Sequence, residues 1–329
     1  MSKPKVAFYW CASCGGCEEA VIDLAEGILD VVAAVDIVFW PVALDFKRSD
    51  VEAMPDGSIS VSFINGAVRS SEQHEMVELL RRKSQLVAAF GSCAHLGGIP
   101  GLANLYDRDA VMRTAYLEVP SMTNDDAVCP QRESAVDEGT VTLPELWGTV
   151  KTLDQTIDVD YYVPGCPPPV NIISDALTAI LSGSLPPKGA TLAPDVALCD
   201  ECPRRETKPE KITISRFYRP HEIEIDPEKC LLAQGLLCLG PVTRKGCGAA
   251  CTRVNMPCTG CMGPTGQVTD FGAKALSALA SLIEAKDEEE IKTVLSKVVD
   301  PAGTFFRYSV PASMMHRRIT KQPKGAMKP

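Results

Sequence analysis

The sequence lacks several features that would place it in a common functional class. No stretch holds the about 18 uncharged apolar residues that a membrane span needs, because Asp30 and Asp36 interrupt the most apolar region, residues 28–44. The net charge is −9 and no stripe of basic residues is present, which argues against a nucleic-acid binder. No glycine-rich phosphate loop follows a strand-like segment, so we predict no nucleotide site.

The N-terminus also lacks the pattern of a signal peptide. The sequence passes from Lys5 straight into strand-like residues 6–10, and Glu18 and Glu19 interrupt any apolar core beyond them. We therefore expect a cytoplasmic protein. The C-terminus is basic, and we expect it to be solvated or docked on a partner. Its cations are Arg317, Arg318, Lys321, Lys324 and Lys328.

Cysteine is abundant by contrast, with 14 residues, of which twelve fall into three groups of four. The first group is Cys14, Cys17, Cys93 and Cys166. The second is Cys199, Cys202, Cys230 and Cys238, and the third is Cys247, Cys251, Cys258 and Cys261. Four thiolates are the ligand set of one cubane iron–sulfur cluster. Three clusters in one chain would conduct electrons between two partners.

Other interpretations of these cysteines remain open. Without a secretion signal, C-x-x-C pairs favour metal ligation over disulfides. The second and third groups taken alone are also compatible with two zinc sites, and the first group with buried free thiols. Cys11 and Cys129 are left over, and we interpret both as ordinary thiols.

Strand-like and helix-like segments alternate along the first half of the chain, which predicts an α/β fold with a mostly parallel sheet covered by helices on both faces. We expect strands over residues 6–10, 36–42, 59–63, 85–90 and 161–163. We expect helices over residues 18–35, 71–83, 170–181, 271–284 and 288–299. Residues 97–160 form a long insertion with weak periodicity.

Glycine and proline residues between positions 181 and 194 predict a domain boundary. We assign residues 1–185 to the α/β domain and residues 186–329 to a small, irregular domain. Residues 199–264 hold eight cysteines and little helix or strand pattern, so we expect bound metal to nucleate their fold.

The first cysteine group follows predicted strands. Cys14 and Cys17 come after the first strand, while Cys93 and Cys166 each follow a later one, so all four should meet at one edge of the sheet. Glycines beside them allow close backbone approach to a cluster. Pro167 and Pro168 stiffen the last loop, and one of the two is a candidate for a cis peptide bond.

These motifs resemble those of [NiFe]-hydrogenase small subunits. Cys14-Gly-Gly-Cys17-Glu-Glu, Gly-x-Cys93-x-x-x-Gly-Gly and Gly-Cys166-Pro-Pro resemble the proximal-cluster motifs. The second group resembles the distal-cluster ligands and the third the medial ones. The resemblance implies a flavodoxin-like N-terminal domain and three [4Fe-4S] clusters.

Three positions depart from the pattern of many family members. Cys199 stands where many have histidine, so we expect a distal cluster of lower potential. Cys251 stands where many have proline and a three-iron medial cluster, so we expect a full four-iron cubane. In many family members a glutamate directly precedes the first ligand. Ser13 stands at that position here, so the side chain cannot take the proton role of that glutamate.

Three further side chains near the first group have two interpretations each. Glu18 and Glu19 are candidates for proton relay, or they are acids that suit the first turn of a helix. His95 lies in the Cys93 loop, where it would contact the cluster or a partner, or make a plain polar contact.

The resemblance covers about residues 4–285 and is best to cytoplasmic group-3 hydrogenases of the F420-non-reducing, methyl-viologen-reducing type. It implies a large subunit that holds the Ni–Fe centre and splits H2, a small iron–sulfur adaptor subunit, and often heterodisulfide reductase as the acceptor. We expect the large subunit to dock around Cys14, Cys17 and the 97–160 insertion.

Alternatives from other classes stay open. F420-reducing and NAD(P)-linked hydrogenases share these ligands. The single-cluster subunit of complex I has adjacent cysteines in place of Cys14-Gly-Gly-Cys17 and lacks the eight-cysteine segment. A non-enzymatic iron–sulfur electron carrier is the third alternative.

Overall fold

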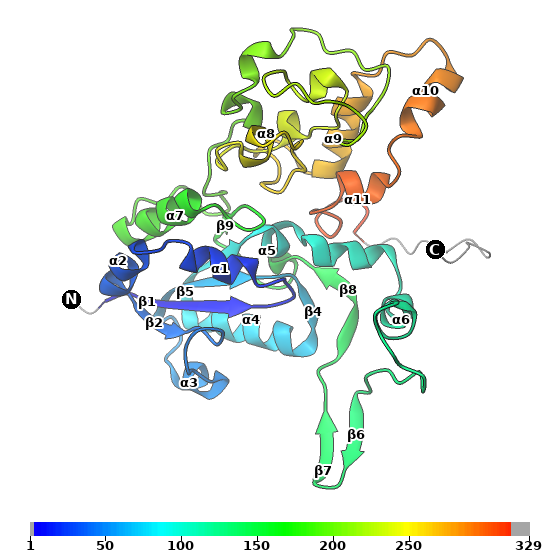
Figure 1. Ribbon diagram of the computed structural model, residues 1–329. Coiled ribbons are helices and arrows are strands. Elements are labelled where there is room, and N and C mark those ends of the chain that lie inside the picture. The colour runs from blue at the N-terminus through cyan, green and yellow to red at the C-terminus, as the bar shows by residue number, and fades with distance from the viewer. Residues whose placement is uncertain (1–2, 317–329) are drawn as a thin grey trace.

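A five-stranded parallel sheet forms the centre of the N-terminal half in the computed structural model, which describes residues 3–316 (Figure 1). Its strands are β1 (Lys5–Trp10), β2 (Asp36–Phe39), β3 (Ile59–Asn65), β5 (Ser84–Phe90) and β9 (Tyr161–Val163). Their order is β2-β1-β3-β5-β9, and every neighbouring pair is parallel. This is the flavodoxin-like order of a doubly wound sheet, so the predicted α/β fold is confirmed.

Alternate residues of the strands point to opposite faces of the sheet, and both faces are covered. Phe8, Phe63 and Phe90 pack on one face against α1 (Gly16–Ile22) and α7 (Val170–Ser182). The neighbouring residues Ile64 and Ala89 pack on the other face against α3 (Arg48–Ala53) and α4 (Ser71–Lys83). Near-continuous apolar strands are typical of a sheet buried on both sides.

The predicted helix over residues 18–35 is wrong, because the structure divides it. α1 ends at Ile22, Ala25 takes a left-handed conformation with φ of 50°, and α2 (Gly27–Ala34) then begins. Gly27 at the start of α2 is a poor helix former, which weakens a continuous helix at this point. The helix expected over residues 71–83 is confirmed as α4, and its N-cap Ser70 accepts a bond from the Gln73 amide.

The 97–160 insertion contains more regular structure than its sequence suggests. Its helices are η1 (Ile99–Leu105), α6 (Arg108–Arg113), η2 (Thr114–Glu118) and η3 (Leu153–Gln155), and its strands are β6 (Glu133–Val136), β7 (Gly139–Thr142) and β8 (Leu146–Lys151). β8 pairs with β4 (Val68–Ser70), and β6 pairs with β7 in a hairpin. The hairpin extends away from the body, and all its residues are exposed (Figure 1).

The C-terminal half is mostly irregular until residue 270, as predicted. Before that point it contains α8 (Ala250–Arg253) and the short 3-10 helices η4 (Leu198–Asp200), η5 (Arg205–Thr207), η6 (Leu232–Gln234) and η7 (Gly240–Val242). α9 (Phe271–Ala280), α10 (Glu288–Leu295) and α11 (Pro301–Phe305) follow. Phe271, Ala275 and Phe305 join the cysteine segment in one apolar core with Leu231 and Leu239. The boundary between residues 185 and 186 stays a prediction.

The last described residues return to the N-terminal half and pack on the loop after β5. Tyr308 O accepts a bond of 3.0 Å from the Gly98 amide, and Gln155 Nε2 donates to Pro311 O at 2.7 Å. A Cβ at Gly97 would lie only 2.2 Å from the Pro311 ring. The two halves are therefore joined beside the loop that holds Cys93.

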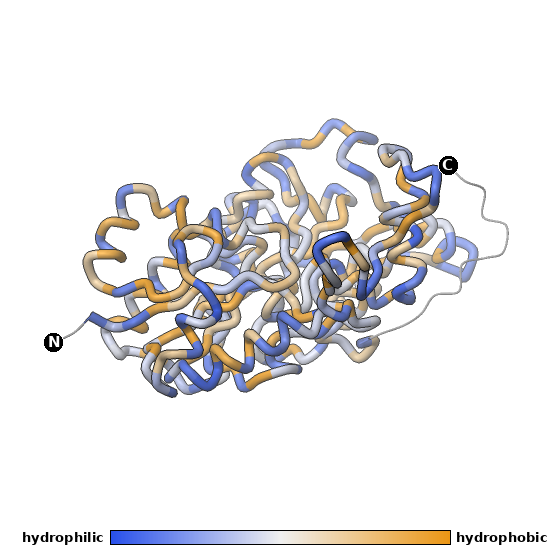
Figure 2. Tube along the Cα trace, turned by 90° about the horizontal axis from the view of Figure 1, so that it is seen from below, coloured by the Kyte–Doolittle hydropathy of each residue, from blue (hydrophilic) through white to orange (hydrophobic). Residues whose placement is uncertain are grey.

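Within residues 3–316, no helix combines the length and apolarity that crossing a bilayer requires. The basic residues Arg317, Arg318, Lys321, Lys324 and Lys328 lie outside the described residues. Figure 2 shows hydrophobic residues along the segments of the trace near the N-terminal end. α2 buries none of its side chains, and Leu29 is 64% exposed.

The packing of α4 yields a prediction for stability. Leu80→Ala empties a fully buried site between α4 and the sheet and should lower the free energy of unfolding by about 2–5 kcal/mol. Leu29→Ala, on the exposed face of α2, is the matched control and should change it by no more than about 0.5 kcal/mol. Urea denaturation of both variants measures the difference, and equal effects would contradict the packing described.

Candidate functional site: three groups of cysteines

The carboxyl ends of three strands bring the first cysteine group together. Cys14 and Cys17 follow β1, with Cys17 in the first turn of α1. Cys93 lies in α5 (Ser92–Leu96), which begins directly after β5, and Cys166 follows β9. The four thiols interact electrostatically in every pairing. The structure therefore brings together all four residues that the sequence predicted to meet.

Glycines make room for the sulfur atoms of this group. A Cβ at Gly91 would lie 2.4 Å from Cys17 Sγ, and one at Gly98 would lie 2.3 Å from Cys93 Sγ. Both glycines have positive φ, of 84° and 57°, which side-chain-bearing residues rarely adopt. The Cys166–Pro167 peptide bond is cis, in the loop where the sequence placed the candidate.

Burial and mutual repulsion act together on these thiols. Burial, and then the negative charge of the neighbouring cysteines, raises the pKa of Cys93 to about 12 and also raises the pKa of Cys17 and Cys166. Four thiolates that repel one another in this way therefore require a cationic group between them. Iron supplies such charge, and its binding would release the thiol protons.

The second group surrounds one pocket. Cys199, Cys202, Cys230 and Cys238 all line it, together with Leu198, Leu231, Leu232 and Pro241. Burial raises the pKa of Cys199 to about 11, although the charge of Lys208 opposes this shift. The amide groups of Gly240 and Cys258 donate hydrogen bonds to Cys238 Sγ. Amide-to-sulfur bonds in an apolar shell are the environment that cubane ligands take.

The third group is held by the turn around α8 and by the chain that follows it. Cys261 interacts with Cys247, Cys251 and Cys258. The amides of Ala249 and Ala250 donate to Cys247 Sγ, and Thr243 donates to Cys258 Sγ. Burial raises the pKa of Cys261 to about 12.

Each group touches the next through a single pair of cysteines. The Cys166 amide of the first group donates a hydrogen bond to Cys261 Sγ of the third. The Cys258 amide of the third group donates to Cys238 Sγ of the second at 3.4 Å. Ser92 Oγ strengthens the first link, because it donates to Cys261 O as well as to Gly165 O. The groups thus form a row in the order first, third, second.

The remaining candidate residues, Cys11, Cys129 and His95, lie in different surroundings. Cys11 is buried in the core on the α4 side of the sheet, and Cys129 lies on the insertion beside Pro130. The His95 ring lies tilted at 34° against the Tyr162 ring, with the ring centroids 4.5 Å apart, and burial lowers the pKa of His95 to about 4, so it is neutral at pH 7. Both cysteines have the surroundings of ordinary thiols.

The acids after Cys17 have different environments. Glu18 is 5% exposed and accepts hydrogen bonds from Trp40 and Asn65, whereas Glu19 points to solvent. Sequence reasoning missed Trp40 and Asn65. Asn65 did carry a signal, since it is a polar residue at the carboxyl end of a buried strand.

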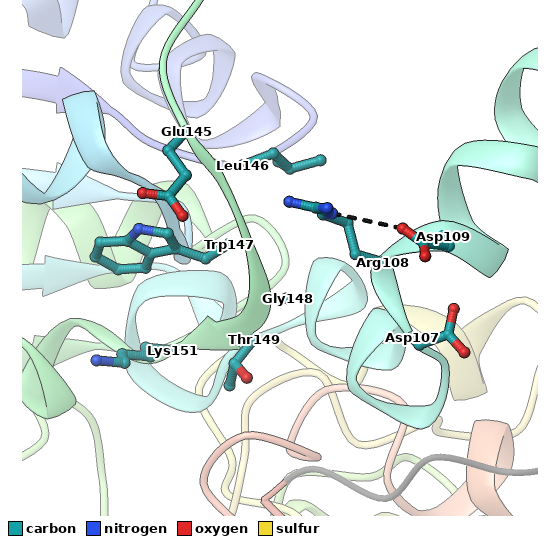
Figure 3. Close-up of a pocket in the computed structure, with 9 residues that line it drawn as sticks. All are labelled: Asp107, Arg108, Asp109, Glu145, Leu146, Trp147, Gly148, Thr149 and Lys151. Carbon is teal, nitrogen blue, oxygen red and sulfur yellow. Dashed lines mark ion pairs between the residues drawn. The ribbon is translucent and has the colours of Figure 1, made fainter. Parts of the chain in front are cut away.

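Other chemistry-bearing groups are sparse among residues 3–316. No set of three or more His, Cys, Asp or Glu side chains there has the geometry of a single metal ion. A separate cleft lies between α6 and β8, where Arg108 pairs with Asp109 at 3.7 Å and Lys151 lies 5.2 Å from the Trp147 ring (Figure 3). The lining of this cleft differs from that of the cysteine groups, because it contains charged side chains and no cysteine.

Several known proteins are similar to this chain in sequence or in fold. Residues 14–180 match the family model of the NADH ubiquinone oxidoreductase 20 Kd subunit. The iron-sulfur subunit of the F420-non-reducing hydrogenase of Archaeoglobus profundus is 42% identical over 96% of this chain and 99% of its own length. A subunit of the F420-non-reducing hydrogenase of Methanothermobacter thermautotrophicus is 36% identical over 98% of this chain and 99% of its own.

A solved structure supports the fold. A chain of the [NiFeSe] hydrogenase of Desulfovibrio vulgaris Hildenborough superposes with a TM-score of 0.50 at 19% identity, covering 80% of this chain and 94% of that one. The family model ends at residue 180, so it includes the first cysteine group alone, whereas the two F420-non-reducing hydrogenase relatives extend across all three.

The glycine beside Cys17 provides a test of the first group. Gly91→Ala would drive a methyl group into Cys17 Sγ and should abolish cluster binding there, with a loss of about four iron atoms per chain. Gly189→Ala is the matched control, because Gly189 has a similar φ of 88° but no atom within 4 Å of the added carbon. Iron analysis of anaerobically purified protein measures the outcome, and unchanged iron in Gly91→Ala would contradict the packing.

Proposed function

Because this chain belongs to the family of F420-non-reducing hydrogenase iron–sulfur subunits, the electron-transfer subunits of hydrogenases, we propose that it relays electrons from H2 oxidation through three [4Fe-4S] clusters. The electrons originate at the Ni–Fe site of its large subunit. The chain provides no nickel ligand in this proposal; its task is to hold the clusters in a row and to dock its partners.

The row of cysteine groups is the observation that carries the proposal. The links Cys166–Cys261 and Cys258–Cys238 support an electron path that runs from the first group through the third to the second. We assign the proximal cluster to Cys14, Cys17, Cys93 and Cys166, and the medial cluster to Cys247, Cys251, Cys258 and Cys261. We assign the distal cluster to Cys199, Cys202, Cys230 and Cys238. Electrons then enter at the carboxyl edge of the sheet and leave from the irregular C-terminal half.

The donor set fits iron–sulfur clusters chemically. Each group offers four thiols and backbone amides directed at sulfur. When bound, such clusters supply one-electron chemistry, which zinc cannot. The same chain without a hydrogenase partner would act as an iron–sulfur carrier, the alternative that the experiment below distinguishes.

The large subunit should dock next to the first group. Apolar side chains on the helices after Cys17 are exposed, with Ile22 at 54%, Leu29 at 64% and Val32 at 43%. We propose that the large subunit also covers the exposed β6–β7 hairpin, because an isolated two-stranded hairpin is only marginally stable in water. An obligate subunit interface would cover both.

The onward partners rest on the family resemblance alone. We propose a small iron–sulfur adaptor subunit beside the distal cluster and heterodisulfide reductase beyond it, in the cytoplasm. Partial exposure of Cys199, Cys202 and Cys230 favours the second cysteine group as the point where electrons leave the chain.

Cys251 determines the nuclearity of the medial cluster. With a fourth thiolate at this position, mild oxidation of the parent should give no three-iron EPR signal. Cys251→Ala should give a strong one, at about one spin per chain, because one iron loses its protein ligand. Cys129→Ala is the control and should match the parent. A strong three-iron signal in the intact parent would contradict the assignment.

The proposal as a whole is tested on the anaerobically purified native complex. We expect H2-dependent reduction of a viologen dye, with nickel present and, besides the iron of the partner subunits, enough iron for three cubanes, about twelve atoms per copy of this chain. Iron without nickel or activity would instead indicate an electron carrier. Zinc in place of iron would overturn the assignment of the second and third groups.

A further inference from the structure

A buried carboxylate closes the loop that carries two of the proximal cysteines. Glu18 directly follows Cys17 and is 5% exposed. Asn65 Nδ2 donates to Glu18 Oε1 at 2.5 Å, and Trp40 Nε1 donates to Glu18 Oε2. Both carboxylate oxygens therefore have a partner, one at the end of β3 and the other just after β2.

Asn65 also holds the opposite end of the same loop. Its Oδ1 accepts a hydrogen bond from Ser13 Oγ at 3.0 Å, and the Ser13 hydroxyl in turn accepts one from the Gly15 amide at 3.2 Å. Its Nδ2 further contacts Tyr9 O at 3.3 Å. Ser13 precedes Cys14 and Glu18 follows Cys17, so one amide group at 1% exposure fixes both ends of the ligand loop.

Burial raises the pKa of the Glu18 carboxyl, but the directions of its hydrogen bonds favour the ionised form. An indole N–H is a donor and cannot accept, so Glu18 Oε2 must accept. Asn65 presents its oxygen to Ser13 and its NH2 group to Glu18, so Glu18 Oε1 also accepts. A carboxylate satisfies both donors, whereas a protonated carboxyl would direct its O–H at one of them.

This charge lies next to a cluster ligand in a dry setting. Glu18 is close enough to repel negative charge on Cys17 Sγ. Trp40 is 4% exposed and packs at a tilt against Phe8, with the ring centroids 4.7 Å apart, so little water screens the interaction. Reduction of a cluster adds one negative charge, and a fixed carboxylate nearby opposes it.

We propose that Glu18 is a positioning residue that, with Asn65 and Trp40, fixes the Cys14–Cys17 loop and lowers the reduction potential of the proximal cluster. The inference rests on the proposed function, since it needs a cluster at the first cysteine group. It assigns Glu18 a fixed structural and electrostatic role and leaves proton relay to other groups.

The test compares two neighbouring glutamates in the anaerobically purified complex. Glu18→Gln removes the buried charge and places an NH2 group against one of the two donors, Trp40 or Asn65, so the midpoint potential of the proximal cluster should shift upward. Glu19→Gln removes an exposed charge one residue away and should leave it unchanged. EPR-monitored redox titration measures the potentials, and the proximal signal is the one that Cys14→Ser alters.

The outcomes separate this inference from the proposed function. An unchanged proximal potential in Glu18→Gln with full iron content would overturn the inference. If Glu18→Gln loses the proximal cluster, its potential cannot be measured. The Glu18→Asp variant, which keeps the negative charge, then tests the inference. Retained iron with a proximal potential close to the parent's supports the inference, and loss of the cluster in Glu18→Asp as well overturns it. If Cys14→Ser alters no signal and no iron in the parent background, the proposed function has failed instead.

Discussion

Negative charge gathered in a dry interior is the constraint on which the rest of the structure depends. Ligating thiols must be deprotonated, yet burial and the neighbouring cysteines raise the pKa of Cys93, Cys199 and Cys261. The polypeptide alone would hold these groups as neutral thiols. Cationic iron would reverse that preference, so the proposed clusters would couple their binding to the folding of the C-terminal half.

The two halves of the chain meet this constraint in different ways. The first group sits on a preformed edge, since the order β2-β1-β3-β5-β9 places the ends of three strands together without help from metal. The second and third groups rely on short 3-10 turns and on α9 and α11, whose side chains Phe271 and Phe305 complete their apolar core. With the proposed clusters bound, a rigid edge joined to a metal-dependent half would account for the contrast between the regular and the irregular part of the chain.

The sequence was sufficient for the sheet and for the grouping of the cysteines, because both depend on local periodicity and spacing. The parallel strands and α4 were predictable in this way. Other features depend on contacts between distant residues. The division of the 18–35 helix depends on a left-handed Ala25, and the β4–β8 pair joins segments about 80 residues apart. Asn65 is marked in the sequence by its polar side chain at the end of a buried strand, whereas Trp40 becomes informative only through its hydrogen bond to Glu18.

The packing of the Cys93 loop also sets an order of events during synthesis. Ser92 Oγ bonds to the carbonyl of Cys261, which lies 169 residues further along the chain, and Gly97 and Gly98 rest against Pro311 and Tyr308. A ribosome completes the sheet long before it reaches these residues. The first cysteine group therefore stays open on one side until these residues have been made, and the cluster proposed there would be enclosed only by an almost finished chain.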